Sequence, residues 1–266
     1  DFDPAIGRPK EKTESFKQKM EGAKISFSDD IIFEDIPIGP FQQNVPWDWT
    51  TWSEYRRSFE ASVKVPLNYA SYVGHIPLRL AAMGMDAWDR AATPAEIAKM
   101  CELLDDALAA GALGLSDNMH DHDGENRPVP SMLADDAEFS ALFDVMNRYP
   151  NTCYQIIVDT FMRMNGTANL KRLEKLLTGR KIRVQIAGGI PTLWFQAGIL
   201  PEMQKTIEEM RAAGIDVWPG FAHVSPTSVL SITKSLIFAQ SNDYVWHEVV
   251  LAETHAEKER LLRDPD

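Results

Sequence analysis

Regular alternation between apolar strand-like runs and amphipathic helices is the feature that most constrains the fold of this chain. Beyond residue 61, about five such β–α units follow one another. Strands that alternate with helices form parallel sheets, because each helix returns the chain to the starting edge. Uninterrupted apolar strands further indicate that helices cover the sheet. The strand-like runs lie at residues 65–73, 112–117, 153–159, 182–188 and 215–222.

The intervening helices carry clear end signals. At residues 93–111, Thr93 can cap the helix, Pro94 suits its first turn, Glu96 completes a capping box and Gly111 ends it. This pattern predicts a helix with one apolar stripe. Further helices are expected at 135–150, where Asp135 and Glu138 are placed as the cap, and at 168–180 and 200–214.

The spacing of these units is typical of a (β/α)8 barrel, which needs roughly 250 residues. A doubly wound sheet has the same local pattern, but the chain has no G-x-G-x-x-G and no glycine loop that would bind a phosphate. Two or three barrel strands have no candidate here. We therefore predict an α/β fold, a partial or incomplete TIM-like barrel, over residues 61–266, preceded by an irregular and helical segment over residues 1–60. The first residue is not Met, and we expect a piece of a longer polypeptide.

Composition and charge limit the kinds of molecule that this protein is expected to bind. The net charge of −12 repels phosphate backbones, which disfavours nucleic-acid binding. No apolar run is long enough to span a bilayer and no signal peptide is recognisable, so we expect no membrane partner and a cytoplasmic location. Cys101 and Cys153 are expected to be buried free thiols. A small-molecule substrate fits this composition, and homo-oligomerisation is left open.

In a parallel barrel, catalytic groups project from the carboxyl ends of the strands. The polar residues at those ends give a short set of candidates. The candidate catalytic residues are His75 and Arg79, after the first strand. The candidate substrate-binding residues are Ser116, His120, Gln155, Asp159 and His223.

Each candidate also has a structural interpretation. His75 could bond a backbone carbonyl, and Arg79 could pair with a surface carboxylate. His120 and His122 form an H-x-H that resembles a metal motif, although a solvated loop is the favoured interpretation of this pattern. The chain contains no G-x-S-x-G, H-E-x-x-H or C-x-x-C motif.

Three segments taken together resemble the D-aminoacylase (N-acyl-D-amino-acid deacylase) branch of the amidohydrolase superfamily. They are VPWDWTTWSEYRRSF, VGHIPLRLAAMG and RAATPAEIAKMCELLDDALAAGALGLS, and the similarity continues through RPVPS and YQIIVD. The resemblance covers most of residues 40–188 and the rest loosely. It implies a TIM-like, metal-dependent hydrolase acting on carbon–nitrogen bonds other than peptide bonds, typically in N-acyl-D-amino acids, with zinc or another divalent metal as cofactor.

The departures from the family concern its metal ligands. The resemblance implies an H-x-H and a cysteine upstream of residue 1, and an aspartate beyond residue 266. Gln155 stands where a zinc-binding histidine is expected, and Gly188 stands at a second such position. An amide oxygen binds zinc weakly and glycine has no side chain to offer. No metal ligand is therefore assigned in this chain.

Three functions remain open. In the first, a hydrolase takes its metal ligands from a missing part, His75 acts as a general acid–base or supporting group, and Arg79 binds a substrate carboxylate. In the second, the barrel has lost its metal centre and serves in binding or structure. In the third, a divergent enzyme holds a single metal, and the HDHDGENRPVP loop forms part of its pocket.

Overall fold

The computed structural model describes residues 2–3, 8–9, 30–31, 36–37, 46, 48–64, 66–119, 128–158, 168–189, 199–221, 252 and 254–263. A parallel sheet of five strands dominates this part of the chain. Its strands are β5 (Val73–Gly74), β6 (Gly114–Met119), β7 (Cys153–Val158), β8 (Arg183–Gly189) and β9 (Asp216–Phe221).

The strand order in the sheet is the order in the sequence, β5-β6-β7-β8-β9. Each crossover therefore moves the chain one strand further in the same direction, as in a barrel. A doubly wound sheet would reverse direction at a switch point. The predicted α/β architecture of parallel strands alternating with helices is confirmed.

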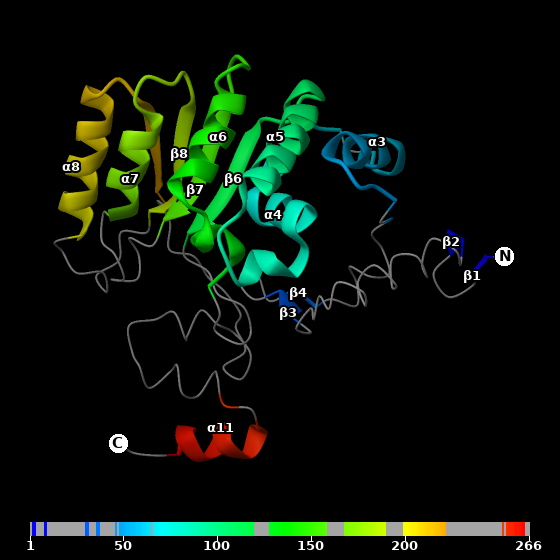
Figure 1. The fold of residues 1–266 in the computed structure, drawn as a ribbon. Coiled ribbons are helices and arrows are strands. Elements are labelled where there is room, and N and C mark those ends of the chain that lie inside the picture. Colours follow the sequence, from blue (N-terminus) through cyan, green and yellow to red (C-terminus); the bar gives the residue numbers. More distant parts are fainter. Residues whose placement is uncertain are drawn as a thin grey trace.

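Helices α5 (Pro94–Ala109), α6 (Asp136–Met146), α7 (Ala168–Leu177) and α8 (Ile199–Ala212) lie side by side along one face of this sheet (Figure 1). Alternate strand residues point to that face and form the core with the helices. The buried strand residues include Leu115, Tyr154, Ile156, Val184 and Val217. They pack on helix residues that include Met100, Leu104, Phe139, Leu142, Leu173 and Met210.

Shorter elements complete the described chain. Helix α4 (His75–Met83) follows β5 directly and continues into the 3-10 turn η1 (Gly84–Trp88), and η2 (Pro130–Leu133) precedes α6. Helix α3 (Trp52–Ser62) runs across residue 60, and the division of the chain at that residue stays a prediction. The rest are the antiparallel pairs β1 (Phe2–Asp3) with β2 (Arg8–Pro9) and β3 (Asp30–Ile31) with β4 (Ile36–Pro37), and helix α11 (His255–Leu262).

The predicted end signals of α5 are confirmed. The Thr93 side chain accepts a hydrogen bond from the Glu96 backbone N–H, and the Glu96 carboxylate accepts one from the Thr93 backbone N–H. Pro94 occupies the first turn. Gly111 follows the helix with φ of 98°, a left-handed conformation that glycine adopts freely. None of the helices in the described part of the chain has the length and apolar character needed to cross a bilayer.

The first predicted strand, residues 65–73, is wrong for most of its length. Only Val73 and the following Gly74 pair with the sheet, and Leu67 and Tyr69 are 75% and 49% exposed. Pro66 has no N–H to donate to a neighbouring strand. The Tyr69 ring instead packs edge-on against Phe59 of α3, with 4.7 Å between centroids. Tyr69 therefore packs on α3, while the Ser71 carbonyl accepts a hydrogen bond from the Leu113 N–H just before β6.

Candidate functional site

Five polar side chains are buried together beside β6, between the sheet and helices α4 and α6. We call His75, Arg79, Asp117, Glu138 and Tyr154 the buried charge cluster. The side chains of the first four are 0% exposed, and Tyr154 is fully buried. Charged residues are almost never fully buried unless they are paired. The hydrogen bonds within the cluster therefore decide what it can do.

Local structure explains why these residues meet. Asp117 shares the helix-facing side of β6 with Leu115 and Met119 because side chains alternate along a strand. Asp135 caps α6 by accepting a 2.9 Å hydrogen bond from the Glu138 N–H, which confirms its predicted role. The Glu138 carboxylate, expected at the same cap, instead points to α4, where it meets His75 and Arg79.

His75 bridges two carboxylates. Its Nδ1 lies 3.1 Å from Asp117 Oδ1, and its Nε2 lies 2.8 Å from Glu138 Oε1. The imidazole ring also packs against Phe139, with 5.2 Å between the ring centroids. Both ring nitrogens are thus engaged within the protein.

Arg79 lies one turn after His75 on α4 and faces the same carboxylate. One terminal nitrogen donates to Glu138 Oε2, and the other donates to the Arg90 carbonyl at 2.8 Å. Its Nε has no hydrogen-bond partner among the described residues. The Glu138 carboxylate thus fills the position beside Arg79 that a substrate carboxylate was expected to take.

Asp117 accepts three hydrogen bonds in all. Besides the contact with His75, Tyr154 donates its hydroxyl to Oδ2 at 2.8 Å, and the Asn118 backbone N–H donates to Oδ1 at 2.8 Å. Hydrogen bonds to an ionised group are stronger than those between neutral groups. Asp117 therefore links β6, β7 and α4.

Burial and pairing shift the pKa values in the cluster. Burial by itself would lower the pKa of His75, but Asp117 and Glu138 outweigh it and raise the pKa to about 9. Burial likewise opposes ionisation of Asp117, yet His75, Tyr154 and the Asn118 N–H hold its pKa below the usual range. Burial, with Asp117 alongside, raises the pKa of Tyr154 well above its ordinary value. The pattern favours a charged His75, a charged Asp117 and a neutral Tyr154.

The opposite side of the sheet carries a different polar set. Ser116, Gln155, Gln185 and Trp218 pair across β6 to β9 in one register, so their side chains form a row. Trp218 is 59% exposed, the other three are partly exposed, and the Tyr72 hydroxyl donates to Gln185 Oε1 at 3.4 Å. We call these four residues the polar row. Within the described residues, helices α5 to α8 cover only the other face.

The candidates from the sequence thus divide between the two faces of the sheet. His75 and Arg79 belong to the buried charge cluster, joined through Glu138. Ser116 and Gln155 belong to the polar row, where Ser116 Oγ lies 3.4 Å from the Val73 carbonyl. His120, Asp159 and His223 lie outside the described residues. The catalytic and substrate-binding roles stay predictions.

Two important partners, Glu138 and Tyr154, were missed as site residues. In the sequence, the helix cap accounts for Glu138, and Tyr154 lies within the predicted strand 153–159. Asp117 is the last residue of the predicted strand 112–117 and is not among the candidates. The alternation of Leu115, Asp117 and Met119 was the available signal, since it places a carboxylate among buried neighbours.

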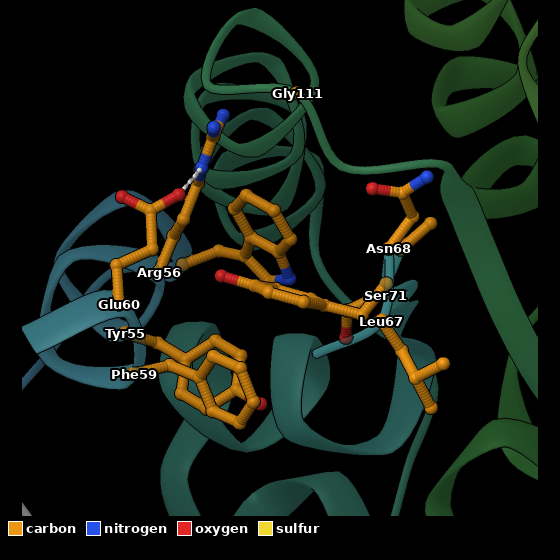
Figure 2. A pocket seen from close by; sticks show the side chains of 11 residues that line it. Tyr55, Arg56, Phe59, Glu60, Leu67, Asn68, Ser71 and Gly111 are labelled. Carbon is orange, nitrogen blue, oxygen red and sulfur yellow. Dashed lines mark hydrogen bonds and ion pairs between the residues drawn. The ribbon is translucent and has the colours of Figure 1, made fainter. Parts of the chain in front are cut away.

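Cavities lie at several places along the described residues. One, of about 300 Å³, lies between α3 and residues 67–71 and is lined by Tyr55, Phe59 and Tyr69, with the Arg56–Glu60 ion pair (2.8 Å) at its side (Figure 2). A second, of about 320 Å³, adjoins the polar row at Gln185 and Trp218.

A metal centre is not formed by the side chains that the structure describes. Among them, no three His, Cys, Asp or Glu residues are grouped so that they could hold an ion. The polar row offers hydroxyl and amide groups, which bind zinc weakly. The described residues therefore do not fit a zinc ion by themselves, and we derive no reaction step through one.

Comparison with known proteins gives two sets of relatives. No protein-family model matches the chain. Uncharacterized proteins of Mycobacterium tuberculosis (strain H37Rv) and Mycobacterium bovis are each 38% identical over 126 residues, which is 44% of this chain and 20% of theirs. The chain thus spans a small part of the length of these relatives.

Solved structures extend the comparison. An N-acyl-D-glutamate deacylase from Bordetella bronchiseptica, complexed with zinc and a phosphonate inhibitor, matches with a TM-score of 0.53 at 24% identity, over 64% of this chain and 33% of that one. A D-aminoacylase with a binuclear metal centre matches with a TM-score of 0.51 at 25% identity, over 66% of this chain and 36% of that one. The five parallel strands and the helices between them thus match part of the amidohydrolase TIM-barrel domain, and the predicted resemblance to D-aminoacylases is confirmed as structural similarity.

Proposed function

We propose that this chain is part of a metal-dependent hydrolase that cleaves the amide C–N bond of a small molecule such as an N-acyl-D-amino acid. The observation that carries the proposal is the similarity to D-aminoacylase, at a TM-score of 0.51 and 25% identity. The chain spans 36% of that protein's length, so the activity is proposed for the protein that contains this chain. The metal ligands would come from residues other than those described.

The polar row is the part of the described chain best suited to meet a substrate. Ser116, Gln155 and Gln185 lie at one level of neighbouring strands, on the face that α5 to α8 leave free. A glutamine amide can donate to a carbonyl oxygen and accept from an amide N–H. We propose that Gln155 and Gln185 orient the substrate amide, with Ser116 beside them. His75 and Arg79 lie on the other face and support the strand ends.

The direct test is an assay of the full-length protein. Metal content and turnover are measured with N-acetyl-D-amino acids and with their L-enantiomers as controls. Bound zinc, D-selective turnover and loss of turnover with a chelator would support the proposal. A preparation that stays metal-free and inactive after zinc is added would contradict it.

A pair of variants tests the proposed role of the row. Gln155→Ala should lower kcat/KM by about 5- to 150-fold, because one well-placed hydrogen bond to a reacting group contributes on the order of 1–3 kcal/mol. Gln204→Ala, the same change on the exposed side of α8, should leave kcat/KM unchanged. Equal effects of the two changes would remove Gln155 from the substrate site.

A second candidate is a barrel that no longer catalyses and serves in binding or structure. The observation that favours it is the pair of residues at the expected histidine positions, Gln155 on β7 and Gly188 on β8. Under this alternative, the full-length protein binds no metal tightly. Stoichiometric zinc in the purified natural protein would therefore exclude it.

A further inference from the structure

We propose that His75 is an imidazolium cation at neutral pH, protonated on both nitrogens, which positions the carboxyl end of β6 and is not a general base. This inference rests on the contacts of the buried charge cluster and does not depend on the hydrolase proposal. It gives His75 a role through Asp117 and Glu138 rather than through a substrate.

The first step is the count of donors and acceptors. Each ring nitrogen of His75 faces a carboxylate oxygen, Asp117 Oδ1 on one side and Glu138 Oε1 on the other. An ionised carboxylate can only accept, and a neutral imidazole has a single N–H. Both contacts are hydrogen bonds only when both nitrogens carry a proton.

The other groups around the two carboxylates favour placing that proton on the imidazole. Asp117 Oδ2 accepts from the Tyr154 hydroxyl, and Asp117 Oδ1 also accepts the Asn118 N–H. Glu138 Oε2 faces the guanidinium of Arg79, which has only donors. The one remaining proton lies in the contact between His75 Nε2 and Glu138 Oε1, and we assign it to the imidazole because that is the more basic of the two groups.

Charge balance leads to the same assignment. Asp117 and Glu138 carry two negative charges, and Arg79 supplies one positive charge. A protonated His75 makes the buried group neutral, whereas a neutral His75 would leave an uncompensated charge away from water. The raised pKa of His75 agrees with this count.

The titratable and charged groups that face the cluster come from all the surrounding elements. They are Arg79 on α4, Cys101 on α5, Asp117 on β6, Glu138 on α6, Tyr154 on β7 and Arg172 on α7.

The position of the cation explains what it does. His75 is the first residue of α4, and it draws together the end of β6 and the start of α6. From Asp117 the contacts pass to the Asn118 backbone, and the Asn118 carbonyl accepts from Ser131 Oγ in η2. Since no nitrogen of His75 is free and its side chain is 0% exposed, it cannot exchange a proton with a substrate in this arrangement. His75 is a positioning residue.

Nuclear magnetic resonance of the full chain labelled with 15N-histidine tests the charge state directly. The expected result at pH 7.5 is that both ring nitrogens of His75 carry a proton, seen as two one-bond N–H couplings protected from exchange with water. A His75 with one bare nitrogen at pH 7.5 would overturn the proposal. The Tyr154→Phe variant identifies the His75 signals, because it removes a hydrogen bond to Asp117, the carboxylate that contacts His75 Nδ1.

A matched pair of variants tests the origin of the charge. Glu138→Gln keeps the shape of the side chain but removes one of the two negative charges, and should lower the pH at which His75 loses its proton by ~1–3 units. Glu102→Gln, on the exposed side of α5 with 70% of its side chain accessible, should leave that pH unchanged. An unchanged titration of His75 in a folded Glu138→Gln protein would refute the assignment.

Discussion

At the scale of single residues, the charge on His75 makes the stability of the fold depend on pH. The pKa is about 9 in the folded protein, against roughly 6.5 in an unfolded chain. A group whose pKa rises on folding contributes fully below its unfolded pKa, and the contribution declines until pH passes the folded value. Asp117 has the opposite sense, because its lowered pKa gives a contribution that is lost as pH falls.

We predict that the contribution of His75 disappears between about pH 6.5 and pH 9. The difference in free energy of unfolding between the parent protein and His75→Gln should shrink by about 3 kcal/mol across this range. Urea unfolding at pH 6, 7.5 and 9.5 measures it. A difference that stays constant with pH would mean that His75 gains no proton on folding.

The Tyr154 hydroxyl offers a second prediction at this scale. Tyr154→Phe removes a donor from the buried, ionised Asp117, and should cost on the order of 1–3 kcal/mol of unfolding free energy. Tyr149→Phe is the matched control, because its hydroxyl donates at 2.7 Å to Asp105, a carboxylate that is 44% exposed. Water can replace that donor, and the cost should be smaller. Equal costs would show that burial of Asp117 adds nothing.

The sequence identified His75 and Arg79 as candidate residues, but it did not predict on which face of the sheet their side chains lie. The position of a residue after a strand predicts that it is near the strand end, and this holds for both. The direction of the side chain depends on the helix that starts at His75 and on Glu138, which is 63 residues away in the chain. No local pattern carries that information, so the partners of the cluster could not be identified from the sequence.

At the scale of elements, a helix could be predicted where all of its capping residues lie within one short segment. The Thr93, Pro94 and Glu96 pattern predicts α5 because its capping contacts lie within a few residues. The strand predicted at 65–73 was mostly wrong because strands and extended segments that pack elsewhere have the same apolar composition. Tyr69 packs against Phe59 of α3. A contact between separate elements of this kind cannot be read from the local sequence.

Close pairing of β6 with β7 gives a prediction about an element. A Cβ at Gly114 would overlap the Cys153 carbonyl oxygen on the neighbouring strand, so Gly114→Ala must push the two strands apart. Gly179 has a positive φ of 83° but open space around it. Gly179→Ala should therefore cost about 1 kcal/mol for its backbone conformation, and Gly114→Ala at least 3 kcal/mol. Thermal unfolding of both variants measures this, and equal losses would contradict the close approach.

At the scale of the whole molecule, the sheet has a helix-covered face and a face that carries the polar row. Barrels bury both faces of their strands. The described β–α units match part of such a barrel and span 36% of the D-aminoacylase chain. An exposed Trp218 and a row of amides are what the interior surface of an incomplete barrel would present.

This arrangement predicts unequal protection of the strands from hydrogen exchange. Strand β7 pairs along its length with β6 and β8, whereas β5 pairs with β6 only through Val73 and Gly74. Amides that open only when the whole sheet unfolds exchange slowest. Mass spectrometry of the full chain in deuterated buffer should therefore show β7 peptides exchanging at least tenfold more slowly than the peptide that contains β5. Equal protection would mean that another segment pairs with β5, and the sheet edge seen among the described residues would then be covered in solution.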